Sequence, residues 1–440
     1  MNNVPEIRPA FNRSVKINFD GGDLSSDAGL FLVREFAKKV GIHELIEKKF
    51  RTNDTAERRH TDAENLLQMV YQKIAGYFRD DDADELTDEP VFQTLLGKEA
   101  LASQRTLSRF HHRMDEDTLN QFNGIHRELR KRVYRITPPE MVLFDIDSTL
   151  FETFGEQEGE AFNYHYGGHG YHPLLCYDGL TGDLLKAELR SGSVYTSKDV
   201  TGFMQPLLKE YRNRYPGMNL YLRGDSGFAV PELYEQLERN GVSYAIRLKD
   251  NPALKRESQW METDLNERTR LNTIDYAVEY GEFIYRAGSW NSPRRVVVKM
   301  EKPQNQMICI PTYIVTNMAL PPESLIRLYC NRGRMENFIK ESKNGFDFDT
   351  MSSHSKIVNA NRLQLSALAY NLFNWFRRLV LPDSMCKLQI DTLRLKLLKI
   401  AARVIRAARY LTFKLCSSCP YQEEFRQTFD NIQRLTPLLR

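Results

Sequence analysis

The sequence predicts an α/β protein in which a mixed-sheet core lies between two mostly helical regions. After a short strand-like start, residues 1–136 carry apolar side chains at helical spacing. Pro138 and Pro139 then interrupt the chain, because neither proline continues a helix. Beyond them, short apolar runs alternate with amphipathic segments, a pattern typical of α/β folds. The expected domains are 1–136, 137–350 and 351–440.

Length and composition exclude several classes of protein. The chain has 440 residues, of which 41% are hydrophobic and 27% are charged, which is enough apolar material for a folded core. No run of about 18 apolar residues occurs, so we expect no membrane partner. Six unevenly spaced cysteines suit a reducing compartment, so a cytoplasmic location is expected.

The first region contains a short basic helix, predicted at 104–114 after Ser103. Its polar side carries Arg105 and Arg109. A short helix of this kind can reach a DNA major groove, although many surface helices look the same. Arg105 and Arg109 are therefore candidate DNA contacts within a helical, DNA-binding N-terminal region.

The second region predicts the order strand, hairpin, helix, strand, helix, strand. This order is the outline of a ribonuclease-H-like mixed sheet. A β-rich insertion follows at about 251–320, in which Trp290 lies close to Arg294. An aromatic ring beside a cation can stack on an unpaired DNA base, although packing in the core is the favoured interpretation of Trp290. The predicted strands are 141–144, 172–177, 184–190, 219–223 and 244–248, and the helices are 203–215, 231–239, 323–343 and 359–380.

The C-terminal region, 351–440, concentrates positive charge. Between Arg377 and Lys414, ten Lys or Arg side chains stand against two Asp, a net of +8, so the rest of the chain sums to −5. Apolar residues alternate with these charges at roughly helical spacing, which predicts a helical, basic region. Two interpretations stay open: a solvated helix face, or a surface that contacts a phosphate backbone.

Asp147 and Asp225 each follow a strand that we predict to be buried. A carboxylate there is costly unless it is paired or bound to a metal. Open α/β sheets bind ligands outside the carboxyl ends of their strands, so two such aspartates on neighbouring strands would converge. Oxygen ligands favour Mg²⁺ or Mn²⁺ over zinc. The alternative is that each aspartate caps the following helix.

The helix expected at 323–343 places four functional side chains on one face. At 100° per residue, a stripe about 60° wide and about 21 Å long contains all of them. A carboxylate flanked by cations suits a site where a metal meets a phosphate backbone. The spacing alone is also compatible with an ordinary surface helix. The four residues are Tyr329, Arg332, Glu336 and Lys343.

Together these motifs resemble the DDE transposases of bacterial insertion sequences. The matching segments are Asp147-Ser148-Thr149, Gly224-Asp225 and Tyr329–x2–Arg332–x3–Glu336–x6–Lys343. The last is similar to the Y-R-E-K signature of the branch that carries an insertion before its catalytic glutamate. The resemblance runs from about residue 141 to about residue 378. It implies a ribonuclease-H-like catalytic domain, two divalent ions (Mg²⁺ or Mn²⁺) and cut-and-paste DNA chemistry.

The resemblance also implies residue roles. The implied catalytic metal triad is Asp147, Asp225 and Glu336, and the implied DNA contacts near the cut are Tyr329, Arg332 and Lys343. Asp145 points to the same face of its strand as Asp147, so either aspartate could be the first metal ligand. The Asp-Ser-Thr context favours Asp147.

The implied function is DNA transposition: strand cleavage and strand transfer at terminal inverted repeats. The implied partners are double-stranded DNA, as repeat and as target, and a second copy of the chain in a homodimeric synaptic complex. Two alternatives stay open. One is a catalytically inactive DNA-binding or regulatory protein on the same scaffold, and the other is a structure-specific nuclease without strand transfer.

Overall fold

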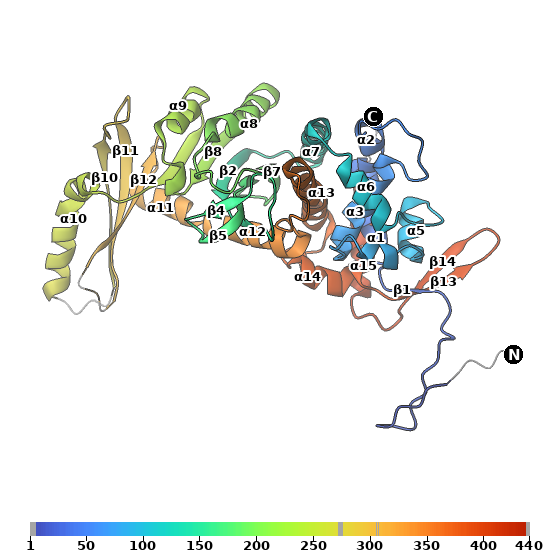
Figure 1. Cartoon of the computed structure of the whole chain (residues 1–440). Coiled ribbons are helices and arrows are strands. Elements are labelled where there is room, and N and C mark those ends of the chain that lie inside the picture. Colours follow the sequence, from blue (N-terminus) through green and yellow to red (C-terminus); the bar gives the residue numbers. More distant parts are fainter. Residues whose placement is uncertain (1–5, 272–275, 305, 307, 437–440) are drawn as a thin grey trace. The chain divides into compact units, whose positions relative to one another are not determined.

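The computed structural model describes residues 6–271, 276–304, 306 and 308–436. The chain divides into two compact units (Figure 1). The first, which we call the sheet unit, contains residues 137–342 and 348–363. The second, the helical unit, contains residues 1–136, 343–347 and 364–440. None of the described helices combines the length and the apolar composition that a membrane span requires.

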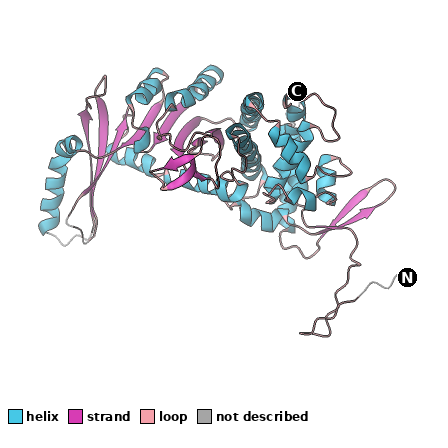
Figure 2. Cartoon of the chain, viewed as in Figure 1, coloured by secondary structure: helices cyan, strands magenta, loops and turns pink. Residues whose placement is uncertain are grey.

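An eight-stranded mixed sheet forms the centre of the sheet unit, as the magenta arrows in Figure 2 show. The strands, in order across the sheet, are β10 (Ala277–Tyr285), β11 (Arg294–Lys302), β12 (Ile310–Thr316), β9 (Ser243–Leu248), β8 (Asn219–Gly224), β2 (Met141–Ser148), β6 (Leu174–Asp178) and β7 (Leu184–Glu188). β2 pairs parallel with β8 and antiparallel with β6. β8 pairs parallel with β9, and the remaining pairs are antiparallel. The prediction of a mixed α/β core is therefore confirmed.

Helices flank this sheet. On β2, Phe144 packs edge-to-face against Tyr211 of α8, with ring centroids 5.3 Å apart. Leu325 and Ile326 of α11 pack on apolar residues of β9, β11 and β12, which holds α11 against the sheet. The helices are α8 (Val200–Arg214), α9 (Pro231–Arg239), α10 (Pro252–Leu271) and α11 (Pro322–Cys330). A small second sheet consists of β3 (Phe151–Glu152), β5 (Gly168–Tyr171) and β4 (Ala161–Asn163).

Two elements of the sheet unit differ from their predictions. β2 continues through Ser148, four residues beyond the apolar run 141–144, because both of its neighbours pair with it past Phe144. Asp145 and Asp147 therefore lie inside the strand. The insertion expected to be β-rich from residue 251 begins with a helix, α10, before β10, β11 and β12 follow.

The helical unit consists mostly of helices, which pack around a shared apolar core. Thr61 begins α3 with a capping box, in which its side chain and Glu64 satisfy each other's backbone N–H groups. The helices are α1 (Leu30–Val40), α2 (Ile42–Lys49), α3 (Asp62–Ala75), α4 (Asp82–Glu85), α5 (Pro90–Leu96), α6 (Gln104–His112), α7 (Glu116–Ile136), α14 (Ile390–Leu393), the π-helical turn Arg394–Leu398 and α15 (Gln422–Arg434). Two further helices, α12 (Gly333–Phe346) and α13 (Lys356–Val380), contribute residues to both units.

The basic C-terminal region is not helical throughout. After α14, β13 (Ala402–Arg406) and β14 (Leu411–Leu415) form a hairpin that adds to β1 (Leu24–Ser25). β-branched and aromatic residues favour strands, and Val404 and Phe413 face each other across this hairpin. Phe413 also packs edge-to-face on Phe31, with centroids 4.7 Å apart. The helical spacing of the charges was therefore not a reliable guide here.

Candidate active site

Asp147 and Asp225 meet at the ends of two parallel strands. β2 and β8 pair in register up to Asp145 and Arg223, an offset of 78 residues. The same offset places Asp225 beside Asp147. Asp225 begins a 3₁₀ turn, Ser226–Phe228, and its Oδ1 accepts a hydrogen bond of 2.8 Å from the Gly227 N–H. The capping interpretation is therefore realised for one oxygen of Asp225, while Oδ2 has no hydrogen-bond partner in the described part of the chain.

The two aspartates affect each other electrostatically. Burial raises the pKa of Asp147 to about 6; the Arg332 guanidinium opposes this rise, and the negative charge of Asp225 adds to it. The Asp147 side chain is 15% exposed, so it retains an accessible edge. A carboxyl whose charge is disfavoured by burial and by a second carboxylate gains from a nearby cation.

The raised pKa of Asp147 predicts a pH-dependent stability. Between the ordinary aspartate pKa and about 6, the folded chain keeps a proton that the unfolded chain has released, so stability falls as the pH rises through this window. Relative to Asp147→Asn, the wild type should lose up to about 3 kcal/mol of unfolding free energy between pH 4 and pH 7. Urea denaturation of both proteins in chelator measures this difference, in which the other titrating groups cancel. A difference independent of pH would contradict the raised pKa.

Asp145 is held by a buried arginine. The Arg223 guanidinium donates to both Asp145 oxygens, Nε to Oδ1 at 2.7 Å and Nη2 to Oδ2 at 2.6 Å. The side chains are 0% and 2% exposed. Both oxygens of Asp145 are thus used inside the protein, whereas Asp147 faces the accessible end of the sheet. This geometry favours Asp147 over Asp145 as the candidate metal ligand.

Arg332 and Tyr329 lie beside the two aspartates, Asp147 and Asp225. Arg332 Nη2 is 2.8 Å from Asp147 Oδ2, and the same nitrogen donates to the Ile146 carbonyl at 3.4 Å. Burial raises the pKa of Tyr329; Arg332 opposes this, and Asp225 and Asp147 add to it. These four side chains therefore form one electrostatic group.

The prediction of a single helix over 323–343 is wrong. α11 ends at Cys330 and α12 begins at Gly333, with Asn331 and Arg332 in a turn. Hydrogen bonds to the third preceding residue tighten the chain there, from Arg332 N–H to the Tyr329 carbonyl at 2.9 Å and from Met335 N–H to the Arg332 carbonyl at 2.8 Å. The stripe calculated for one straight helix does not apply across this turn.

Glu336 and Lys343 lie beyond the turn, in the first and last turns of α12. They are seven positions apart, about two helical turns, so they stay on one side of that helix. Glu336 is exposed. In the described part of the chain, no three His, Cys, Asp or Glu side chains are grouped closely enough to hold a metal ion. The structure therefore brings together Asp147 and Asp225 but not Glu336.

The chemistry of the pair fits a divalent cation. Two carboxylates at adjacent strand ends offer only oxygen ligands, the set that Mg²⁺ and Mn²⁺ prefer. The positive charge beside Asp147 is at present that of Arg332. A cation bound by the pair would offset both the burial and the repulsion from Asp225 that raise the pKa of Asp147.

Tyr166, for which no role was predicted, also borders the site. Its hydroxyl donates to the Ser148 carbonyl at 2.9 Å. Burial raises the pKa of Tyr166, and the charges of Asp147 and Asp225 add to this. The only signal in the sequence was its position in the glycine-rich stretch before β6. Arg223 likewise had no predicted role, and its only signal in the sequence was its place directly before Gly224-Asp225.

Comparison with known families gives this geometry a context. Residues 7–437 match the family described as "Transposase DDE domain group 1". The chain belongs to this family. A transposase acts on DNA, so membership supports a DNA partner and an enzyme of the polynucleotidyl transferase or nuclease class. The predicted resemblance to DDE transposases is thus confirmed at the level of the family.

One solved structure similar to this transposase is the piggyBac transposase in its synaptic complex with hairpin DNA, determined by cryo-EM. The two share 13% sequence identity with a TM-score of 0.45, over 94% of this chain and 86% of that one. No curated protein matches the chain.

The candidate DNA contacts of the transposase differ in exposure. Arg105 and Arg109 of α6 are both exposed and lie one helical turn apart. Trp290 and Arg294 are only 5% and 6% exposed. Arg294 lies over the Trp290 ring at 5.6 Å and pairs with both oxygens of Glu238. Stacking of Trp290 on a DNA base would require this packed cluster to open.

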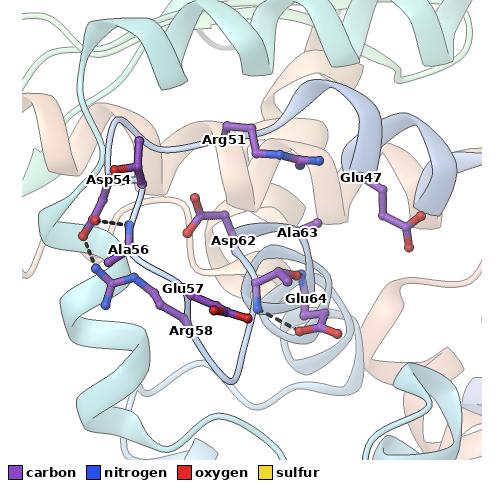
Figure 3. Close-up of a pocket in the computed structure, with 11 residues that line it drawn as sticks. Glu47, Arg51, Asp54, Ala56, Glu57, Arg58, Asp62, Ala63 and Glu64 are labelled. Atoms are coloured by element: carbon purple, nitrogen blue, oxygen red, sulfur yellow. Dashed lines mark hydrogen bonds and ion pairs between the residues drawn. The ribbon is translucent and has the colours of Figure 1, made fainter.

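The transposase also has a pocket of about 540 Å³ in its helical unit (Figure 3). Five acidic side chains line it together with Arg51 and Arg58. Arg58 forms an ion pair with Asp54, and Glu64 belongs to the capping box of α3. None of the predicted site residues lines this pocket. The acidic residues are Glu47, Asp54, Glu57, Asp62 and Glu64.

Proposed function

We propose that this DDE transposase cleaves DNA at the terminal inverted repeats of a bacterial insertion sequence and joins the freed ends to target DNA. The observation that carries the proposal is the meeting of Asp147 and Asp225 at the ends of neighbouring parallel strands, with Arg332 beside them. The strand order β7-β6-β2-β8-β9, antiparallel on one side of β2 and parallel on the other, supports a ribonuclease-H-like core. The spacing from Tyr329 to Lys343 supports the Y-R-E-K branch.

Asp147, Asp225 and Glu336 would hold two Mg²⁺ or Mn²⁺ ions, and bound ions would supply activation of a water or 3′-hydroxyl nucleophile and charge stabilisation of the leaving oxygen. Asp145 stays with Arg223 and fixes the end of β2. Arg332, which pairs with Asp147 at 2.8 Å, would hold a phosphate oxygen with its guanidinium group. The Tyr329 hydroxyl and the Lys343 ammonium would add further contacts to the DNA backbone.

Joining two ends of one element requires that both be held at once. We therefore include a homodimer on paired ends in the proposal. Arg105 and Arg109, exposed on α6, would contribute to recognition of the end sequence.

The test uses the full chain, Mg²⁺ and a labelled duplex that carries the element's own terminal repeat. The expected products are nicked or cleaved strands, and, after addition of supercoiled target DNA, covalently joined strands. Binding without cleavage in Mg²⁺ or Mn²⁺ would instead identify a DNA-binding or regulatory protein. Cleavage without joining would identify a nuclease.

A further inference from the structure

The β13–β14 hairpin presents an exposed basic face. The two strands pair from Ala402–Leu415 to Arg406–Leu411, and the turn closes through a hydrogen bond from the Ala407 N–H to the Tyr410 carbonyl. β14 is the outer strand of its sheet. In Figure 1 the turn of this hairpin lies away from the helices around it. The hairpin is therefore open to a partner along its outer strand and at its turn.

The opposite face anchors the hairpin. Val404 is buried, and Phe413 packs on Phe31 of α1. The Val404 N–H also donates to the Asp23 carbonyl at 2.8 Å. Because side chains alternate along a strand, this anchoring leaves the other face, with Arg403 and Lys414, toward solvent. The orientation of the basic face is thus set by packing.

Arg403 lies directly opposite Lys414 across the hairpin. Like charges in this arrangement destabilise a strand pair unless an anion lies between or over them. Neither side chain has an ion-pair partner among the residues that the structure describes. Repulsion between Arg403 and Lys414 therefore lowers the stability of the hairpin when no anion is bound.

The surrounding charges do not compensate this pair. No Asp or Glu occurs between Asp391 and Glu423 in the sequence. By the same alternation Arg406 lies on the Val404 face, where its one contact is at 3.7 Å to Asp23 with both side chains well exposed. Arg409 adds positive charge at the turn. The cross-strand pair Arg403 and Lys414, with Arg409 at the turn, makes this ribbon complementary to a polyanion, and a two-stranded ribbon fits a DNA groove.

We infer that the exposed face of the β13–β14 hairpin binds the phosphate backbone of duplex DNA, with Arg403 and Lys414 as its central contacts. The inference rests on the proposed function for the identity of the polyanion. It adds to that function a positioning surface outside the active site. Backbone contacts of this kind add affinity without reading sequence.

The test measures binding of a labelled random-sequence duplex to the full chain in chelator, by fluorescence anisotropy over a range of salt concentrations. For the double variant Arg403→Gln with Lys414→Gln, the slope of log K against log salt should become shallower by about 2. Affinity should fall roughly 50-fold at 0.1 M salt and stay nearly unchanged at 1 M salt. Its melting temperature should equal or exceed that of the wild type, because the repulsion is removed.

Lys48→Gln with Lys49→Gln is the matched control. Both lysines are exposed in the last turn of α2, so this variant loses the same charge elsewhere on the helical unit. An unchanged salt slope in the hairpin variant, or an equal change in the control, would overturn the inference. The inference would also be overturned if the hairpin variant lost binding to phosphatidylserine vesicles but kept its binding to duplex DNA. DNA cleavage by the wild type is measured in a separate assay. If the wild type does not cleave DNA but the hairpin variant still has the shallower salt slope, the result argues against the proposed function and not against this inference.

Discussion

Glu336→Gln is expected to lower strand cleavage by at least about 10³-fold, because the loss of a metal-binding carboxylate removes several kcal/mol of transition-state stabilisation. Duplex binding should stay close to that of the wild type, since the substitution removes a negative charge and no cation. Single-turnover cleavage of a labelled terminal repeat in Mg²⁺ measures the first quantity, and anisotropy in chelator measures the second.

The position of Glu336 makes this a demanding prediction. The side chain is exposed in the first turn of α12, and it does not form a group with Asp147 and Asp225 in the free chain. The turn at Asn331 and Arg332 lies between α12 and the anchored helix α11. If Glu336 belongs to the triad, it must join the aspartates when DNA and metal bind.

Glu323→Gln provides the matched control. Glu323 is an exposed glutamate in the first turn of α11 and pairs with Arg327 at 2.7 Å. Glu323→Gln makes the same chemical change as Glu336→Gln. Its cleavage rate should remain within about twofold of the wild-type rate, because exposed ion pairs contribute little to stability. Cleavage retained in Glu336→Gln would exclude Glu336 from the triad. Equal losses in both variants would point to a general effect of charge.

Patterns that depend on local chemistry were predictable from the sequence. The strands and helices between residues 141 and 248 form within a few residues of their expected bounds, because each apolar run became a buried strand or helix face. The convergence of Asp147 and Asp225 followed from their places at the ends of two such strands. Parallel pairing of neighbouring strands then brings the two carboxylates together.

Features that depend on long-range packing were not predictable. The turn at Asn331 interrupts a segment whose spacing is helical on both sides. Core packing was the favoured interpretation of Trp290, but its neighbours could not be identified from the sequence: Trp290 and Arg294 pack with Tyr234 and Glu238 from α9. In both cases the outcome is decided by residues distant in sequence, which periodicity does not register.

Arg223→Met is expected to lower the free energy of unfolding by about 3–5 kcal/mol, because it leaves the buried Asp145 carboxylate without its partner. Arg223 and Asp145 are 1% and 0% exposed, so water cannot replace the lost hydrogen bonds. The site is also tightly packed: a Cβ on Gly179 would lie 2.2 Å from Asp145 Oδ2. Urea denaturation at pH 7 measures the loss.

A surface ion pair gives the comparison. Arg268 of α10 pairs with Asp264 at 2.8 Å and with Glu279 at 2.7 Å, and the Arg268 and Asp264 side chains are 54% and 51% exposed. Arg268→Met should therefore cost less than about 1 kcal/mol. A similar cost for both arginine variants would mean that burial of the Asp145–Arg223 pair has little effect on its strength.

The double variant Asp145→Val with Arg223→Met separates stability from function. Replacing both members of a buried ion pair by apolar residues is often neutral, so most of the lost stability should return. Arg223 also donates from Nη1 to the Leu328 carbonyl at 2.6 Å, one residue before Tyr329, and the double variant does not restore this contact. Cleavage should therefore stay low in a well-folded protein. Full recovery of cleavage together with stability would show that Arg223 serves the fold and not the placement of Tyr329 and Arg332.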